Sequence, residues 1–211
     1  MAPHPSHPEV QVTTVLRLAG FVDSEATAQL TGLSVTDVQQ QLAQLEADRL
    51  ARRRGETETW WLTPAGHDHN ARLLQAEIDH HGLRSEVDAL YRRFRTLNQP
   101  FLELCTRWQV RVVDGNDVVN DHLDETHDAA AISDLVATHR DVGPIVDQMA
   151  TLLMRWGGYR GRFEHAVTRV QAGDIDWFAR PSVDSYHSVW FELHEDLLAT
   201  LGIARSQEER H

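Results

Sequence analysis

The sequence lacks several features on which common classes of protein depend. Its 211 residues include one cysteine, Cys105, so the chain can form neither an internal disulfide nor a four-thiolate zinc site. No stretch approaches the roughly 18 consecutive apolar residues that cross a bilayer. The opening residues, MAPHPSHPEV, have neither the basic region nor the apolar run of an export signal. We therefore expect a cytoplasmic protein with no membrane partner.

Lysine is absent, and charge of one sign dominates. All 20 basic residues are arginines and stand against 32 acidic residues, which gives a formal net charge of −12. Such a charge opposes indiscriminate binding of nucleic acid, so any contact with DNA must be local. Each phosphate contact would be made by a guanidinium, whose planar fork suits phosphate oxygens.

Motifs of the common enzyme classes are also missing. There is no glycine-rich phosphate loop, no nucleophile elbow and no HExxH helix. The segment DGNDVVNDHLDE, residues 114–125, begins like a calcium loop. However, Val118 and Val119 stand where the loop needs an oxygen ligand and a glycine. We interpret this segment as a solvated acidic connector, and we expect the protein not to be an enzyme.

The first 80 residues predict three short helices and then a hairpin. Helical spacing begins at 12–18, and a second helix fits 24–30 with Ser24 as its cap. Ser34 can cap the third helix. An inward-facing stripe follows it, formed by Val38, Leu42, Leu45 and Leu50. Two strand-like runs, 50–54 and 59–63, then flank the turn Gly55-Glu56-Thr57-Glu58. This order of elements predicts a winged helix-turn-helix.

Two motifs in this region resemble those of MarR-type winged-helix regulators. Residues 34–53, with Leu45-Glu46 and Arg52-Arg53, resemble the recognition helix and first wing strand of that family. The run Leu62-Thr63-Pro64-Ala65-Gly66 is similar to the end of the second wing strand and the cap of the next helix. Arg49 departs from the family, which usually has glycine there. The resemblance covers about residues 10–80 and implies a transcriptional regulator that binds double-stranded DNA as a homodimer, because two half-sites need two reading helices.

The residues expected to face DNA are polar or basic. They are Ser34, Thr36, Gln39, Gln40 and Gln44 of the third helix, and Arg52, Arg53 and Arg54 of the first wing strand. Glutamine can pair with adenine through two hydrogen bonds, and the arginines suit phosphates. Against this, residues 1–80 contain 6 arginines and 11 acidic residues, a net charge of −5, and Asp37 lies beside the reading surface. A winged helix that binds another protein instead of DNA is therefore the alternative.

The rest of the chain predicts an all-α domain, so the fold class is α+β and mostly α. Helices are expected over 64–80, 83–112, 126–156, 160–172 and 182–201, with a kink or break at Gly143-Pro144. The predicted organisation is a disordered tail at 1–9, a winged-helix domain at 10–80, a helical-bundle domain at 83–203 and a flexible tail at 204–211. We expect the helical domain to dimerise and to bind an effector.

The last predicted helix carries the candidate effector residues. A helical wheel places Tyr186, His187, Trp190 and His194 within one apolar arc that includes Phe191, and places Ser185 and Asp196 on the other side. The two histidines are about 10.5 Å apart along the axis, too far to hold one metal ion by themselves. His165 is the first candidate for a third ligand. The spacing from His165 through Ala172-Gly173-Asp174 to His187 faintly resembles the FCD-type effector domains of GntR regulators, which bind a metal. Three interpretations stay open: core histidines, an organic effector pocket, or a divalent metal at His165, His187 and His194.

Overall fold

A computed structural model describes residues 2–55 and 58–205. The described chain is mostly helical, and a hairpin follows its first three helices, as the sequence predicts. A second antiparallel hairpin lies within residues 83–203, so the expectation of an all-α second domain is wrong. It divides into two compact units. Unit 1 comprises the residues up to Asp88, Ala150–Gly158 and the residues from Glu192 onward, and unit 2 comprises Ala89–Met149 and Tyr159–Phe191. The expected single boundary near residue 80 is therefore replaced by a division in which unit 1 has three chain segments.

Unit 1 begins with three helices: α1 (Pro8–Ala19), α2 (Ser24–Thr31) and α3 (Val35–Ala47). The Ser34 side chain accepts a hydrogen bond from the Asp37 amide, so Ser34 caps α3 as expected. The cap of α2 is Asp23 rather than the expected Ser24, because the Asp23 carboxylate accepts from the Ala26 amide. Helix α1 contacts α2, α3 and α4, and α3 contacts the first hairpin.

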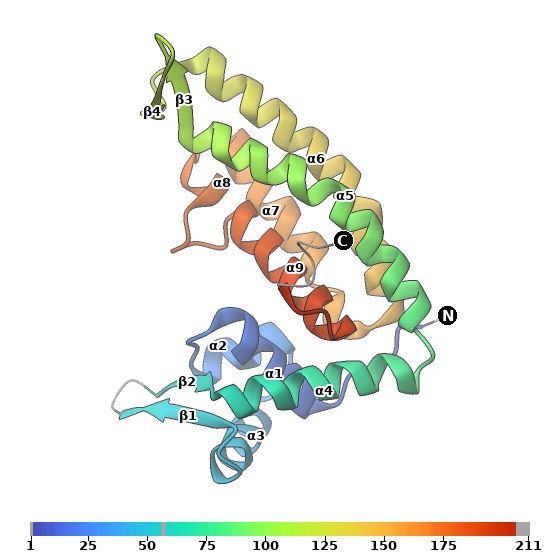
Figure 1. Ribbon diagram of the computed structural model, residues 1–211. Helices are drawn as coiled ribbons and strands as arrows, with labels where there is room; N and C mark the ends of the chain where they lie inside the picture. Colours follow the sequence, from blue (N-terminus) through green and yellow to red (C-terminus); the bar gives the residue numbers. More distant parts are fainter. Residues whose placement is uncertain (1, 56–57, 206–211) are drawn as a thin grey trace. The chain divides into compact units, whose positions relative to one another are not determined.

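The first hairpin joins β1 (Ala51–Arg54) and β2 (Thr59–Leu62), with Arg52 opposite Trp61 and Arg53 opposite Trp60. An isolated antiparallel bridge adds Val22 beside Trp60. The first hairpin and three helices enclose a core formed by Val12, Leu16, Val38, Leu42, Leu45, Ala51, Trp60 and Leu62. Figure 1 shows the first hairpin extending beyond the helices from which it emerges.

The chain enters α4 (Pro64–His80) through a close backbone contact. Thr63 caps this helix by accepting from the Gly66 amide. A Cβ atom at Gly66 would lie 2.0 Å from the Leu50 carbonyl oxygen, so only glycine fits there. Arg49, at the position where the resembling family uses glycine, has a φ of 61° and adopts the left-handed conformation itself.

The N-terminal residues are not the disordered tail that their prolines suggest. The His4 amide donates to the Leu152 carbonyl at 2.9 Å, and the Met154 amide donates to the His4 carbonyl at 2.9 Å. The His7 side chain caps α1, which begins at Pro8. These hydrogen bonds, and the proline-compatible first turn of α1, fix a segment that the sequence alone indicates to be extended and free. At the other end, residues 206–211 of the expected flexible tail lie outside the described residues.

Unit 2 contains most of α5 (Arg84–Gln109) and α6 (Glu125–Leu152), together with α7 (Tyr159–Gln171), α8 (Asp176–Ala179) and the start of α9 (Tyr186–Leu201). Helices α5 and α6 lie side by side, and a second hairpin joins them, formed by β3 (Val110–Val113) and β4 (Asn116–Val119) (Figure 1). A short 3-10 helix, η2 (Met154–Trp156), follows α6 in unit 1.

Several helix predictions for this part of the chain need correction. The helix expected to reach residue 112 ends at Gln109, and the expected acidic connector forms β4 instead. Its turn is Asp114-Gly115, whose φ values of 50° and 78° suit a tight hairpin. Helix α6 continues through Gly143-Pro144, so of the two expected outcomes, a kink or a break, the break is wrong. Its end at Leu152 and the start of α9 at Tyr186 both shorten the expected helices.

The core of unit 2 combines aliphatic and aromatic side chains. The buried aromatic residues are Tyr91, Phe94, Phe101, Trp108, Tyr159, Phe163, Phe178, Tyr186 and Trp190. Trp108 and Phe178 stack with ring centroids 4.2 Å apart, and Phe101 and Trp190 do so at the same distance. Within residues 2–55 and 58–205, no helix combines the length and apolar character needed to cross a membrane.

Candidate functional site

The N-terminal half of α3 presents an exposed polar surface. Thr36, Gln39 and Gln40 are exposed, while Val38 and Leu42 on the opposite side are completely buried. This alternation follows from the 3.6-residue period of a helix with one apolar stripe. The three polar side chains are therefore available to contact a partner, as the sequence predicts.

Two other predicted contact residues of α3 are already engaged within the protein. The Ser34 hydroxyl lies 2.6 Å from an Asp37 carboxylate oxygen, in addition to capping the Asp37 amide. Gln44 donates to Asp48 at 2.9 Å. Asp37 also places a negative charge in the first helical turn, where it stabilises α3 through the helix dipole. Of the five predicted contact residues of α3, Thr36, Gln39 and Gln40 are consequently the ones whose side chains are not used in these hydrogen bonds.

The predicted arginines all lie exposed on β1, but they do not share one face. Arg53 is opposite the buried Trp60, and its guanidinium carbon lies 5.7 Å from the centre of the Trp60 ring. Because strand residues alternate between faces, Arg52 and Arg54 point to the other face of the hairpin. A phosphate on the face opposite to Trp60 can therefore contact Arg52 and Arg54, whereas Arg53 lies on the same face as Trp60.

The predicted effector residues Tyr186 and Trp190 belong to the aromatic core of unit 2. Tyr186 is completely buried, and Trp190 donates to the Asn98 side chain at 2.9 Å. Among the described residues the Tyr186 hydroxyl has no hydrogen-bond partner. Burial raises the pKa of this phenol, so it stays protonated. These contacts make the cluster a packed core with one unsatisfied hydroxyl.

The histidines of α9 are half-buried, and the helical wheel misplaced some of their neighbours. His187 stacks on Phe101 with ring centroids 6.2 Å apart, and burial lowers the pKa of its imidazole. His194 is also half-buried. Phe191, expected inside, is 46% exposed, whereas Asp196, expected outside, is 2% exposed. The reason for the error is that Asp196 has buried cationic and indole partners that the sequence pattern does not reveal.

The predicted metal ligands do not form a site. His165 is exposed and lies edge-on to Trp177, with ring centroids 4.7 Å apart. Across residues 2–55 and 58–205, no group of three or more histidine, cysteine, aspartate or glutamate side chains is arranged to hold a metal ion. The expected set of His165, His187 and His194 is therefore not brought together.

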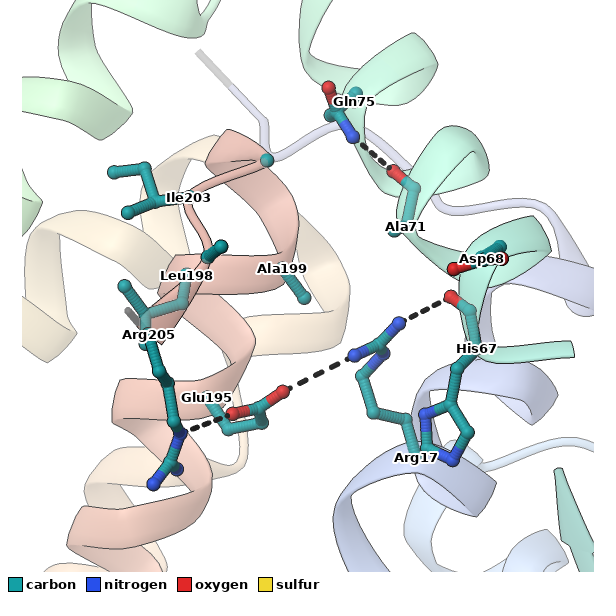
Figure 2. Close-up of a pocket in the computed structure, with 12 residues that line it drawn as sticks. Arg17, His67, Asp68, Ala71, Gln75, Glu195, Leu198, Ala199, Ile203 and Arg205 are labelled. Atoms are coloured by element: carbon teal, nitrogen blue, oxygen red, sulfur yellow. Dashed lines mark hydrogen bonds and ion pairs between the residues drawn. The ribbon is translucent and has the colours of Figure 1, made fainter. Parts of the chain in front are cut away.

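A pocket of about 540 Å³ lies in unit 1 between α1, α4, the C-terminal half of α9 and the residues that follow α9. Figure 2 shows Glu195 between two arginines. One oxygen of Glu195 is 3.2 Å from Arg17 Nη1, and the other is 3.1 Å from Arg205 Nε. Arg17 also donates to the Asn70 side chain and the His67 carbonyl. Arg17 thus donates hydrogen bonds to three partners within the protein. We therefore interpret this pocket as a place where α1, α4 and α9 are held together, rather than as a ligand site.

A buried ion-pair network, which the sequence analysis missed, lies elsewhere in unit 1. Arg155 pairs with Glu77 of α4 at 2.9 Å and with Asp196 of α9 at 2.5 Å. Asp196 also accepts from the Trp156 indole at 3.1 Å, and Thr200 accepts from Arg155 at 2.8 Å. These partners are 41 to 78 residues from Arg155 along the chain, so no local pattern could identify them.

Comparison of the chain with models of protein families, with curated proteins and with solved structures found no match.

Proposed function

We propose that the protein is a non-enzymatic, DNA-binding transcriptional regulator in which residues 10–80 act as a winged helix. The observation that carries this proposal is the exposed face of Thr36, Gln39 and Gln40 on α3, next to a hairpin strand with three exposed arginines. A helix with such a face fits the major groove, and an adjacent basic hairpin suits the phosphate backbone. The resemblance to MarR-type regulators at residues 34–53 and 62–66 supports the same reading.

Each part of this surface has a distinct role in the proposal. Gln39 and Gln40 contact base edges, where a glutamine amide can donate to and accept from adenine at the same time. Arg52 and Arg54 contact phosphates, which position the helix without selecting sequence. Because the protein is acidic, binding should depend on these few local contacts and should weaken steeply with salt.

Unit 2 supplies the regulatory part of the proposal. We propose that it binds a small organic effector beside the half-buried His187, at the edge of the packed rings of Tyr186 and Trp190, and that the protein acts as a homodimer. An effector can shift the reading helices only if it binds one arrangement of the dimer more tightly than another. A metal effector held by His165, His187 and His194 is not part of the proposal, because the described residues form no metal-holding group.

The test is fluorescence anisotropy with labelled duplex DNA from the region that flanks the protein's own gene. Gln40→Ala should weaken binding by about 1–3 kcal/mol at the preferred sequence. Arg52→Ala should weaken binding to all sequences and reduce the salt dependence. Gln99→Ala, a matched change on the exposed side of α5, should leave binding unchanged. The proposal fails if the wild-type protein binds no such duplex at low salt.

A second candidate function is that the same domain contacts a protein rather than DNA. Two observations favour it: the Asp37 carboxylate at the start of α3, and the excess of 11 acidic residues over 6 arginines in residues 1–80. The same experiment separates the two functions. Absence of duplex binding, with Asp37→Asn also failing to restore it, would favour the protein-interaction role.

A further inference from the structure

Three side chains form one row across the outer face of the first hairpin. Arg52 of β1 lies opposite Trp61 of β2. The antiparallel bridge between Val22 and Trp60 places the preceding residue, Phe21, beside Trp61. The rings of Phe21 and Trp61 are 5.6 Å apart between centroids and tilted by 46°. The order across the sheet is therefore guanidinium, indole and phenyl.

This row lies on the face opposite to the hydrophobic core. Trp60 is 8% exposed and packs into the core, so strand alternation directs Trp61 to the other side. Phe21 is 65% exposed, Trp61 is half-buried and Arg52 is exposed. Arg54 follows on the same face, because it is two residues from Arg52. We name these four residues, Phe21, Arg52, Arg54 and Trp61, the aromatic–arginine face.

We propose that the aromatic–arginine face binds single-stranded nucleic acid. An unpaired base would stack on the exposed ring of Phe21 and the half-buried ring of Trp61, and the neighbouring phosphates would lie against Arg52 and Arg54. Aromatic rings accept the flat surface of any base, and a positively charged groove beside them follows the backbone in proteins that bind single strands. Asp23 is the acidic residue nearest to Phe21 in the sequence. One of its carboxylate oxygens accepts a hydrogen bond from the Ala26 amide at 2.7 Å, so this carboxylate is engaged in capping α2.

Charge complementarity favours this occupant over the other partners that an apolar face could accept. Two guanidinium groups beside exposed rings match a polyanion with planar bases. Base pairs within a duplex stack on one another, so a duplex would offer this face its phosphates but no free base surface. The inference goes beyond the proposed function, since it adds the rings of Phe21 and Trp61 and another form of nucleic acid, although the two sites share Arg52 and Arg54.

The test measures anisotropy of a labelled oligothymidylate about 12 nucleotides long with the full chain, a length that matches typical single-strand sites. Phe21→Ser and Trp61→Thr should each weaken binding roughly tenfold, as expected when one stacking partner is lost. Trp61→Tyr should bind within about threefold of wild type, because tyrosine can still stack. Phe191→Ser is the matched control, since Phe191 is an exposed aromatic residue of unit 2 and should not affect binding.

Each result either supports or overturns the inference. It is overturned if wild-type protein does not bind the oligothymidylate at low salt, or if Phe21→Ser binds as tightly as wild type. It is also wrong if Phe21→Ser instead abolishes self-association in sedimentation, which would make the face a protein interface. Should Trp61→Thr fail to fold, the exposed position of Phe21 keeps the test decisive. Loss of duplex binding in Gln40→Ala with oligothymidylate binding retained supports the inference, because it shows that single-strand binding does not depend on base contacts by α3.

Discussion

Arg155 Nη1 lies 2.5 Å from Oδ1 of Asp196, and the two side chains are only 4% and 3% exposed. Glu77 binds the same guanidinium from α4 and is also buried. Two carboxylates therefore depend on one cation in a region with little water. Two carboxylates face one guanidinium, so the network holds more negative than positive charge. One oxygen of Glu77 has no hydrogen-bond partner among the described residues.

Arg155→Met should destabilise the protein by about 3–5 kcal/mol, because it leaves Glu77 and Asp196 buried without their cation. Denaturant-induced unfolding measures this change. Arg84→Met is the control: its pair with Asp79 is 44% and 55% exposed and is screened by water, so its loss should destabilise the protein far less than the loss of Arg155. Equal losses in the two variants would show that burial of the Arg155 network does not matter.

Gly66→Ala should destabilise unit 1, since the new methyl group would meet the Leu50 carbonyl at 2.0 Å and force the turn into α4 to move. We expect a loss of about 1–3 kcal/mol, the usual cost of overpacking. The comparison is Gly161→Ala in α7, which has open space around it and should stabilise by roughly 0.5–1 kcal/mol. Thermal unfolding of both variants measures whether the two changes in stability have opposite signs. A Gly66→Ala variant as stable as wild type would contradict the close contact with the Leu50 carbonyl.

Stability should fall as the pH drops below 6.5, partly through His187. Burial lowers the pKa of His187 from its ordinary value of 6.5, so the unfolded chain takes up a proton more readily than the folded one. The free energy of unfolding consequently decreases between pH 6.5 and the lower folded-state pKa. His187→Gln should reduce this slope in urea titrations at a series of pH values. His67 and His81, whose pKa values burial also lowers, should account for part of the remaining slope, and an unchanged slope would refute the assignment to His187.

Cys105 should react with thiol reagents only when unit 2 opens. It is the single cysteine of the chain and is 5% exposed, and burial raises the pKa of its thiol to about 12. Since the thiolate is the reactive form, labelling by iodoacetamide at neutral pH should be very slow in native protein and fast in urea. Rapid labelling without denaturant would mean that α5 opens far more often than its packing indicates.

Much of the fold follows from local sequence signals. Ser34 and Thr63 cap helices because their side chains can accept from an amide three residues ahead, and α4 has the predicted limits of Pro64 and His80. The pairing of the two strands of the first hairpin is confirmed for the same kind of reason, since both strands are close in the sequence. Residues 56–57 of the predicted turn lie outside the described residues. The second hairpin could also have been predicted. Two valine-rich runs around Asp114-Gly115 are a hairpin signal, which the partial similarity of residues 114–125 to a calcium loop obscures.

The remaining errors arise where partners distant in the chain override a local pattern. A helical wheel assigns aspartate to the solvent side, but Asp196 lies inside because Arg155 and Trp156 meet it there. Phe191 shows the converse, an apolar residue that remains exposed. Sequence spacing alone pairs His165 with His187. In the structure the His165 ring instead lies edge-on to the Trp177 ring. The exposure of the candidate residues on α3 agrees with the prediction, because exposure on a short amphipathic helix depends mainly on the periodicity of its own sequence.

The three-segment composition of unit 1 has a consequence for how the protein is made. Glu77 emerges from the ribosome early, but Arg155 follows 78 residues later and Asp196 another 41 after that. Unit 1 therefore cannot complete its buried network until α9 has been synthesised, while every segment of unit 2 has already emerged. Nascent chains that end before α9 should hold Glu77 and Arg155 in an incomplete pairing, and they are the species on which we expect chaperones to act.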